Sequence, residues 1–336
     1  MSEEEEEDVN FKAGTEIISQ KSAYIVVRLL GEGGFGAVYL VKEKGNGKQH
    51  AMKVERKIEK RRHSKLKMEI AILKLAGTGK HFTQIVDRGK KDKEGYFFLV
   101  MQLVGKSLAD LKAERPEKVF SYQTGLGVSS QCLEAVEDLH KHGFIHRDLK
   151  PQNYACGLPD KRHLIYLLDF GIARKIINTK NELKTPRAQV GFKGTVRFAP
   201  LACHRSLEMA PKDDCESWFY LLIDLILVGG LTWKKIGDKN EVLRAKEEAR
   251  QGDRKGLYGT LKHTEELNKI IDYIDGLAYQ DRVDYQYIYK FLEDACTNLG
   301  LNIDAPYDWE VKKKESDREK PGKEKEKETQ PMSNKN

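Results

Sequence analysis

The first third of the chain carries short apolar runs separated by turn residues, a pattern typical of β-strands. The clearest turn signal is at residues 45–47, with an apolar, β-branched run before it and another after it. The expected strands are residues 24–30, 37–41, 50–55 and 96–103. A basic segment then predicts a helix that ends at Gly77, because its apolar residues recur at helical spacing. These residues are Leu66, Ile70 and Leu73.

After Gly105 the apolar spacing becomes mostly helical. Helices are expected at residues 107–113, around 132–139, at 218–227, and near 240–250, 263–275 and 285–299. A strand-rich part followed by a helix-rich part predicts an α+β protein of two lobes with a cleft near Gly105. We place a small N-lobe at residues 21–104 and a larger C-lobe at residues 105–305.

The two ends of the chain differ in composition from this central part. Acidic residues crowd the beginning, and lysine and glutamate alternate through the last residues. Neither composition can bury an apolar core. We therefore expect residues 1–20 and 306–336 to be disordered tails.

Composition narrows the class of protein. The 336 residues suffice for a substantial core, and 39% apolar with 33% charged residues is ordinary for a soluble protein. No apolar segment follows Met1, and the run 218–230 is too short to cross a bilayer, so no secretory signal or membrane contact is expected. Five dispersed cysteines without a CxxC pair indicate a reduced, intracellular protein, in the cytoplasm or nucleus. The net charge of +7 is modest, no nucleic-acid motif is present, and we expect a monomer.

The most informative stretch is the octapeptide 146–153, which reads HRDLKPQN and which we call the catalytic loop. It combines a carboxylate, cations and an amide within eight residues. Phosphoryl transfer needs such a set: a carboxylate at the attacking hydroxyl, a cation near the phosphate and an oxygen ligand for magnesium. The spacing predicts Asp148 as the base and Asn153 as a metal ligand. The alternative at this point is a charged surface loop.

The glycine-rich stretch 31–36 fits two kinds of site. The same spacing marks the dinucleotide-binding βαβ unit, in which a helix starts directly after the glycines. Here residues 37–41 are apolar and β-branched, and a turn arrives at Gly45. The loop therefore joins two antiparallel strands and would cover phosphates as a lid, since glycine lets phosphate approach backbone N–H groups. Val38 and Ala51 would line the roof of an adenine pocket.

Three further charged residues complete the set. Lys53 lies mid-strand between apolar neighbours, and Glu69 lies in an otherwise apolar helical stretch, where a carboxylate requires a partner. We predict that they pair and hold the lysine against the α- and β-phosphates. Asp169 follows the buried run 164–168 and, with Asn153, would hold Mg²⁺. The glycine lid, Lys53, Glu69, the catalytic loop and Asp169 occur in the order that a protein kinase requires.

Three more residues are expected to support the reaction. Lys150 lies two positions after Asp148 and would screen charge on the transferred phosphate, and a lysine here favours serine or threonine as acceptor. Thr195 would orient Asp148 and Lys150; the alternative is a loop threonine without a role. Asp214, just before the apolar helix, would brace the backbone of the catalytic loop.

With these residues the chain resembles the casein kinase 1 family, and most closely its tau-tubulin kinase branch, over about residues 20–305. The resemblance rests on residues 100–111 (VMQLVGKSLADL), 194–198 (GTVRF) and 213–217 (DDCES). It implies a bilobal kinase that binds ATP and Mg²⁺, with Met101 as gatekeeper and residues 102–104 as the hinge that hydrogen-bonds adenine. The nucleotide-binding set is Leu30, Gly31, Glu32, Gly33, Gly34, Phe35, Gly36, Val38, Ala51, Lys53, Glu69, Met101, Gln102, Leu103 and Val104.

The same resemblance implies acidic or already phosphorylated protein substrates. Arg197 occupies the family's anion-binding position, and its planar guanidinium suits phosphate. Lys234, Lys235 and Arg244 are weaker candidates for the same pocket. After Phe198, Leu201 stands where many kinases have a glutamate that pairs with a distant arginine. Leu201 cannot make that pair, so the anchoring of the substrate loop is left open.

Two alternatives to an active serine/threonine kinase remain. A pseudokinase would bind nucleotide or act as a scaffold through its tails, but the complete charged set of Lys53, Glu69, Asp148, Asn153 and Asp169 argues against it. A small-molecule or lipid kinase is less favoured because residues 194–198 suit a peptide.

Overall fold

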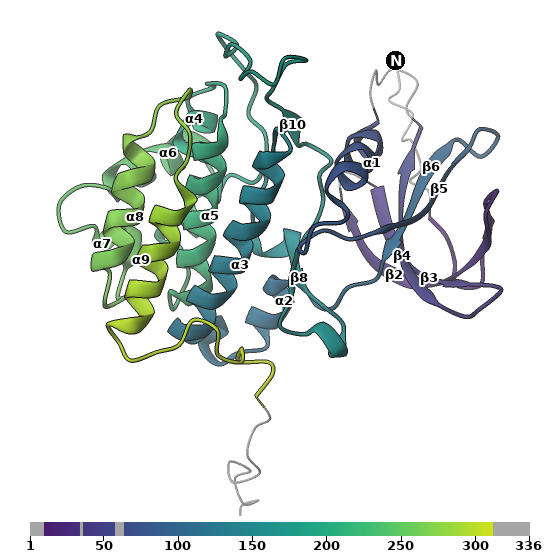
Figure 1. Ribbon diagram of the computed structural model, residues 1–336, viewed down its shortest axis with the longest axis horizontal. Helices are drawn as coiled ribbons and strands as arrows, with labels where there is room; N and C mark the ends of the chain where they lie inside the picture. Colours follow the sequence, from purple (N-terminus) through teal and green to yellow (C-terminus); the bar gives the residue numbers. More distant parts are fainter. Residues whose placement is uncertain (1–9, 34–35, 58–63, 312–336) are drawn as a thin grey trace, which may run out of the picture.

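The computed structural model describes residues 10–33, 36–57 and 64–311, which form two lobes (Figure 1). The N-lobe is built on one six-stranded antiparallel sheet in the order β1-β2-β3-β4-β6-β5. Its strands are β1 (Glu16–Ile18), β2 (Ala23–Gly33), β3 (Gly36–Glu43), β4 (Gln49–Arg56), β5 (Ile85–Lys91) and β6 (Tyr96–Gln102), and helix α1 (Lys65–Ala76) packs against it.

Strand β4 shows how the two faces of this sheet differ. Side chains alternate between the two faces of a strand. Met52 and Val54 join the apolar core on one face of the sheet. Ala51 lies on the other face with the main core, and Lys53 shares that face, so this buried lysine reaches Glu69 of α1 and Asp169. The mid-strand position of Lys53 thus explains how it reaches the site.

The C-lobe is mainly helical, and Figure 1 shows α3 and α5 in its interior with α8 and α9 alongside. Almost every residue of α5 is buried, and its Trp218 Nε1 donates to the Ser129 carbonyl of α3 at 2.7 Å. The helices are α2 (Leu108–Ala113), α3 (Tyr122–Lys141), α4 (Leu201–His204), α5 (Pro211–Ile226), α6 (Lys239–Glu248), α7 (Lys255–Tyr258), α8 (Glu265–Gly276) and α9 (Tyr285–Thr297). The helices expected from the apolar spacing are therefore confirmed.

Short strands and 3₁₀ turns complete the described part of the fold, and Asn153 ends one of these turns. Strands β7 (Phe144–Ile145) and β10 (Arg174–Lys175) pair with each other, as do β8 (Tyr154–Cys156) and β9 (Ile165–Leu167). The 3₁₀ turns are η1 (Pro116–Lys118), η2 (Pro151–Asn153), η3 (Pro159–Lys161) and η4 (Thr232–Lys235).

The structure differs from the expected tail boundaries at both ends. Phe11 packs its ring against Tyr39 and Tyr96, and β1 extends the sheet, so residues 10–20 belong to the N-lobe. At the other end Tyr307 is buried, and the Asp308 carboxylate accepts a hydrogen bond from the backbone of Ser121 at the start of α3 (2.8 Å). Both segments thus contact the folded lobes through individual apolar or capping side chains within a mainly polar stretch. Residues 1–9 and 312–336 lie outside the described residues.

Across the described ranges, none of the helices combines the length and the apolar character needed to cross a membrane. All five cysteines are free and buried.

Candidate active site

Asp214 fixes the backbone of the catalytic loop. It is fully buried at the start of α5, and its two carboxylate oxygens accept the N–H groups of His146 (2.6 Å) and Arg147 (2.9 Å). Burial alone would raise the pKa of Asp214, but hydrogen bonds from His140 and His146 outweigh it and lower that pKa. Arg147 is thereby held at a φ of 70°, an uncommon backbone conformation for a residue other than glycine. The predicted bracing role of Asp214 agrees with these contacts.

The three residues predicted around the acceptor hydroxyl lie in one hydrogen-bonded cluster. Thr195 Oγ1 donates to Asp148 Oδ1 at 2.7 Å, while Lys150 Nζ donates to Asp148 Oδ2 at 2.8 Å and to Thr195 Oγ1 at 2.9 Å. Each oxygen of the carboxylate is therefore oriented by a separate donor. Such fixed geometry is what a general base requires.

Gly194 lets the loop that carries Thr195 approach the catalytic loop. Its φ is +92°, and a Cβ atom there would lie 2.4 Å from the Arg147 carbonyl oxygen. Only glycine tolerates both the backbone conformation and the close contact. The backbone conformation and the close contact thus explain why the GTVRF motif begins with glycine.

Lys53, Glu69 and Asp169 form the predicted chain of charges between the lobes. Lys53 Nζ lies 2.6 Å from Glu69 Oε2 and 2.7 Å from Asp169 Oδ1. Burial would lower the pKa of Lys53, but the two carboxylates outweigh it and raise that pKa above its ordinary value. Burial would also raise the pKa of Asp169, yet Lys53 keeps it below its usual range. The lysine is therefore charged, and Asp169 is ionised beside it.

Asn153 and Asp169 fit the requirements of a magnesium ion. Asn153 Nδ2 donates to the Asp148 carbonyl at 2.8 Å, which leaves the amide oxygen to face away from that bond. The N–H of Leu168, the residue before Asp169, donates to the Asn153 carbonyl at 2.8 Å and keeps the two positions adjacent. One amide oxygen and one carboxylate suit Mg²⁺, which takes few protein ligands when phosphates supply the rest.

Four of the predicted nucleotide-binding residues lie together: Ala51 and Met101 belong to the main apolar core, and Val38 and Leu103 pack against it. Ala51 of β4 pairs with Leu40 of β3 on one side and Met101 of β6 on the other. Gln102 N–H already donates to the Gln84 carbonyl at 2.9 Å, so adenine would use other backbone groups of residues 102–104. Gly34 and Phe35 of the lid lie outside the described residues.

Arg197 lies in a cleft of about 550 Å³ that borders the catalytic loop at Pro151 and Gln152. Lys234 and Lys235 line the same cleft, and Arg244 does not. The other basic lining residues, Lys112 and Lys118, come from α2 and η1, which sequence reasoning had not connected with this cleft.

The charges in this cleft, which we call the anion cleft, are only partly neutralised. Asp224 pairs with Lys112 at 2.5 Å and lies 3.9 Å from Arg197. No carboxylate of the described residues lies within ion-pair distance of Lys118 or Lys235. Five basic residues line the cleft against two acidic ones, Asp224 and Glu117, so it keeps an excess of positive charge.

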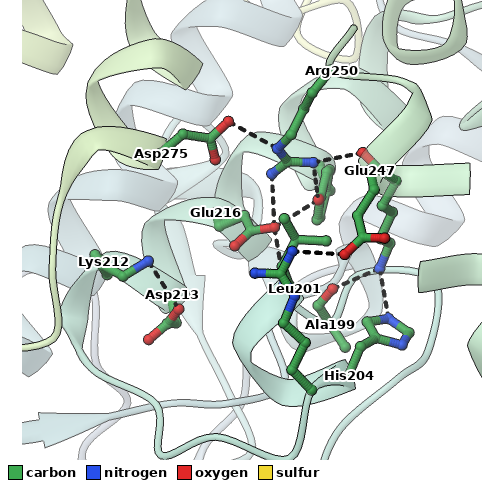
Figure 2. Close-up of polar contacts among 12 residues, drawn as sticks. Ala199, Leu201, His204, Lys212, Asp213, Glu216, Glu247, Arg250 and Asp275 are labelled. Atoms are coloured by element: carbon green, nitrogen blue, oxygen red, sulfur yellow. Dashed lines mark hydrogen bonds and ion pairs between the residues drawn. The ribbon is translucent and has the colours of Figure 1, made fainter. Parts of the chain in front are cut away.

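The missing glutamate at position 201 is replaced from another element (Figure 2). Glu216 of α5 accepts a hydrogen bond from the Leu201 N–H at 3.0 Å, and Arg250 lies 2.8 Å from the same carboxylate oxygen, Oε1. Asp275 of α8 holds the other side of Arg250 at 2.8 Å. The segment that contains Leu201 is thus anchored through its backbone. Sequence reasoning missed this partner, although an acid inside an apolar helix is the signal that could have found it.

Comparisons with known proteins agree with this geometry. Residues 24–251 match the protein kinase domain family. A probable serine/threonine-protein kinase of Dictyostelium discoideum is 33% identical over 310 residues, covering 91% of this chain and 59% of that protein. The serine/threonine-protein kinase spe-6 of Caenorhabditis elegans is 32% identical over 317 residues, covering 92% and 82%. A putative serine/threonine-protein kinase of the same nematode is 32% identical over 270 residues, covering 78% of each chain.

Proposed function

The chain belongs to the protein kinase domain family, and from this premise we propose that it transfers the γ-phosphate of ATP to serine or threonine in protein substrates. The observation that carries this proposal is the oriented carboxylate of Asp148, held by Lys150 and Thr195 beside Asn153. When bound, ATP and Mg²⁺ would supply the phosphoryl group and neutralise part of its charge.

Each of these residues would then have a separate role in phosphoryl transfer. Asp148 would accept a hydrogen bond from the acceptor hydroxyl and take up its proton. Lys53, kept charged by its two carboxylates, would orient the phosphates, and Asn153 with Asp169 would hold the metal. Lys150 would screen the negative charge that builds up between phosphate and acceptor.

We further propose a substrate preference of the casein kinase 1 type, for acidic or already phosphorylated segments. The support is the anion cleft, where Arg197, Lys118 and Lys235 offer positive charge next to Pro151 and Gln152 of the catalytic loop. A carboxylate or phosphate a few residues from the acceptor could reach it. Assignment to the tau-tubulin kinase branch, function as a monomer, and a cytoplasmic or nuclear location belong to the same proposal.

The test is a kinase assay of the full chain with Mg-ATP on matched serine peptides, either acidic, phosphorylated or with the acids amidated. Asp148→Ala should lower kcat by at least roughly 10²-fold, from loss of the general base, whereas Asp160→Ala, an exposed carboxylate on η3, should not. Arg197→Ala should remove the preference for charge, and the exposed Arg205→Ala should keep it.

Two results would contradict these proposals separately. A folded wild-type protein without turnover would favour the pseudokinase, and a thermal shift with ATP would show whether nucleotide still binds. Turnover with equal rates on all three peptides would leave the kinase activity standing and remove the substrate preference.

A further inference from the structure

Lys246 of α6 is fully buried in the C-lobe. Its ammonium lies 4.8 Å from the centre of the Tyr220 ring and 5.6 Å from that of Trp233. Within the described part of the chain, no carboxylate oxygen lies within 4.0 Å of it. Aromatic faces attract a cation, but a buried charge also needs hydrogen bonds.

Three acceptors surround this ammonium. Lys246 Nζ donates to the carbonyls of Val196 (2.9 Å) and Ala199 (2.6 Å), and it lies 3.2 Å from His204 Nε2. An ammonium group has three N–H donors, so each acceptor can take one. Figure 2 shows the Ala199 carbonyl and the His204 ring side by side. Two of the three acceptors thus belong to the segment 195–201, which we call the substrate loop.

The substrate loop carries one residue for catalysis and one for recognition. Thr195 donates to the Asp148 carboxylate, and the side chain of Arg197 lines the anion cleft. The N–H groups of Phe198 and Ala199 both donate to the Thr195 carbonyl at 2.9 Å, which makes the segment compact. A contact that fixes the carbonyls of residues 196 and 199 therefore fixes the positions of both functional side chains.

We propose that Lys246 is a positioning residue, whose charged ammonium holds the substrate loop so that Thr195 meets Asp148 and Arg197 faces the substrate. The Arg197 half of this proposal rests on the proposed substrate preference. The Thr195 half requires only that the protein is a kinase.

The protonation state of Lys246 gives this role a pH dependence. Burial lowers the pKa of Lys246 to about 7, against the opposing effect of Glu216. A neutral amine has two donors and cannot serve three acceptors. The hydrogen bonding of Lys246 to the substrate loop should therefore weaken as pH rises above 7.

The titratable and charged side chains near Lys246 come from α5, from α4 and from the residues that follow α6. Glu216 and Tyr220 belong to α5, Cys203 and His204 to α4, and Arg250 follows α6. Burial raises the pKa of Cys203 and of Tyr220, so both stay neutral near pH 7. Burial, with Lys246 nearby, lowers the pKa of His204 to about 4, so its ring is neutral and can accept the hydrogen bond.

The first test needs no variant. Wild-type rates are measured from pH 6.5 to 9 with a peptide whose carboxylates stay ionised throughout. We expect kcat/KM for the peptide to fall at least roughly tenfold between pH 7 and 9, as one deprotonation near 7 requires, while the KM for ATP changes less than about twofold. A flat peptide profile would overturn the proposal.

The second test compares Lys246→Met with Lys239→Met, which replaces an exposed lysine on the same helix. Lys246→Met loses both charge-assisted hydrogen bonds to the substrate loop, so it should lower kcat/KM for the peptide at least roughly tenfold and abolish the fall of kcat/KM above pH 7 (the alkaline decline). Lys239→Met should match the wild type. A folded Lys246→Met protein with wild-type peptide kinetics would also overturn the proposal, and if this variant does not fold, the wild-type profile decides.

Hydrogen exchange separates this proposal from the proposed function. Exchange of the amides at residues 196–199, corrected for intrinsic rates, should be faster in wild type at pH 9 than at pH 7, whether or not the protein turns over substrate. Equal exchange protection of these amides at pH 7 and pH 9 would contradict the positioning role of Lys246. Equal rates on acidic and amidated peptides would count only against the substrate preference.

Discussion

Lys53 and Lys246 are both buried, one in each lobe, but the protein holds them in opposite ways. Lys53 touches two carboxylates, which raise its pKa, so its charge is permanent. Lys246 touches two carbonyls and a neutral imidazole between aromatic rings, and its pKa falls to about 7. Burial alone therefore does not decide the charge of a lysine; the charge of its partners does. The first arrangement suits contact with phosphate, and the second suits control of a loop.

The largest expected effect comes from removing the permanently charged lysine. Lys53→Met removes the proposed donor to the ATP phosphates and leaves Glu69 and Asp169 without the cation that they share. We expect kcat/KM for ATP to fall by roughly 10²-fold or more, measured from initial rates. Lys57→Met, an exposed lysine just beyond the same strand, is the control. Activity within twofold of wild type would show that the pair at Lys53 does not act on the nucleotide.

A smaller effect is expected from the charged network beside Lys246. Arg250→Met leaves Glu216 buried without its cation, so the free energy of unfolding should fall by about 3–5 kcal/mol and the melting temperature by roughly 10 °C. Because the positive charge of Arg250 also lowers the pKa of Lys246, the alkaline decline in peptide turnover should move to higher pH.

The control for Arg250 is Arg205→Met, because Arg205 is exposed and its partner Glu247 is only half-buried; the melting temperature of this variant should stay within a few degrees of wild type. A shift of the alkaline decline to lower pH in Arg250→Met would contradict the assignment of that decline to Lys246.

The smallest change we expect is in the pH dependence of the free energy of unfolding, which tests whether the pKa of Lys246 is lowered. The pKa of Lys246 is about 7 in the folded protein and has an ordinary value of 10.5, so between these values the unfolded chain binds more protons. Stability from this group therefore rises with pH, on the order of 2 kcal/mol between pH 7 and 9. Urea unfolding at the two pH values should show that increase in wild type relative to Lys246→Met. Equal increases in both proteins would contradict the lowered pKa. Activity should fall over the same interval, so the two readouts move in opposite directions.

The two lysines also show what sequence patterns can predict. Lys53 could be predicted because a polar residue in an apolar strand, a glycine lid and an acid in the next helix are all local signals. Lys246 could not, because it lies in a stretch of mostly charged residues, RAKEEAR (244–250), that is typical of an exposed helix. Its burial depends on Tyr220 and Trp233, which come from elements earlier in the chain.

The contact that anchors Leu201 could not be predicted from the sequence, for a related reason. The sequence showed that the usual glutamate is absent, and Glu216 lies within a motif that was used for the family resemblance. Pairing it with the Leu201 N–H and with Arg250 requires the packing of α5 against the residues that follow α6, which no local pattern encodes. The paired strands and amphipathic helices, in contrast, follow from periods of two and about 3.6 residues.

The Glu216 anchor changes which substitutions evolution can accept in the substrate loop. Where a glutamate in the loop itself makes the ion pair, a substitution of that side chain removes the pair. Here the Glu216 carboxylate of α5 accepts a hydrogen bond from the main-chain N–H of Leu201, so the side chain at position 201 takes no part in the contact. A saturation library at this position should tolerate many residues, and proline, which has no N–H, should be the most strongly rejected. Sequence drift at a position usually treated as diagnostic for kinases is therefore compatible with an unchanged fold.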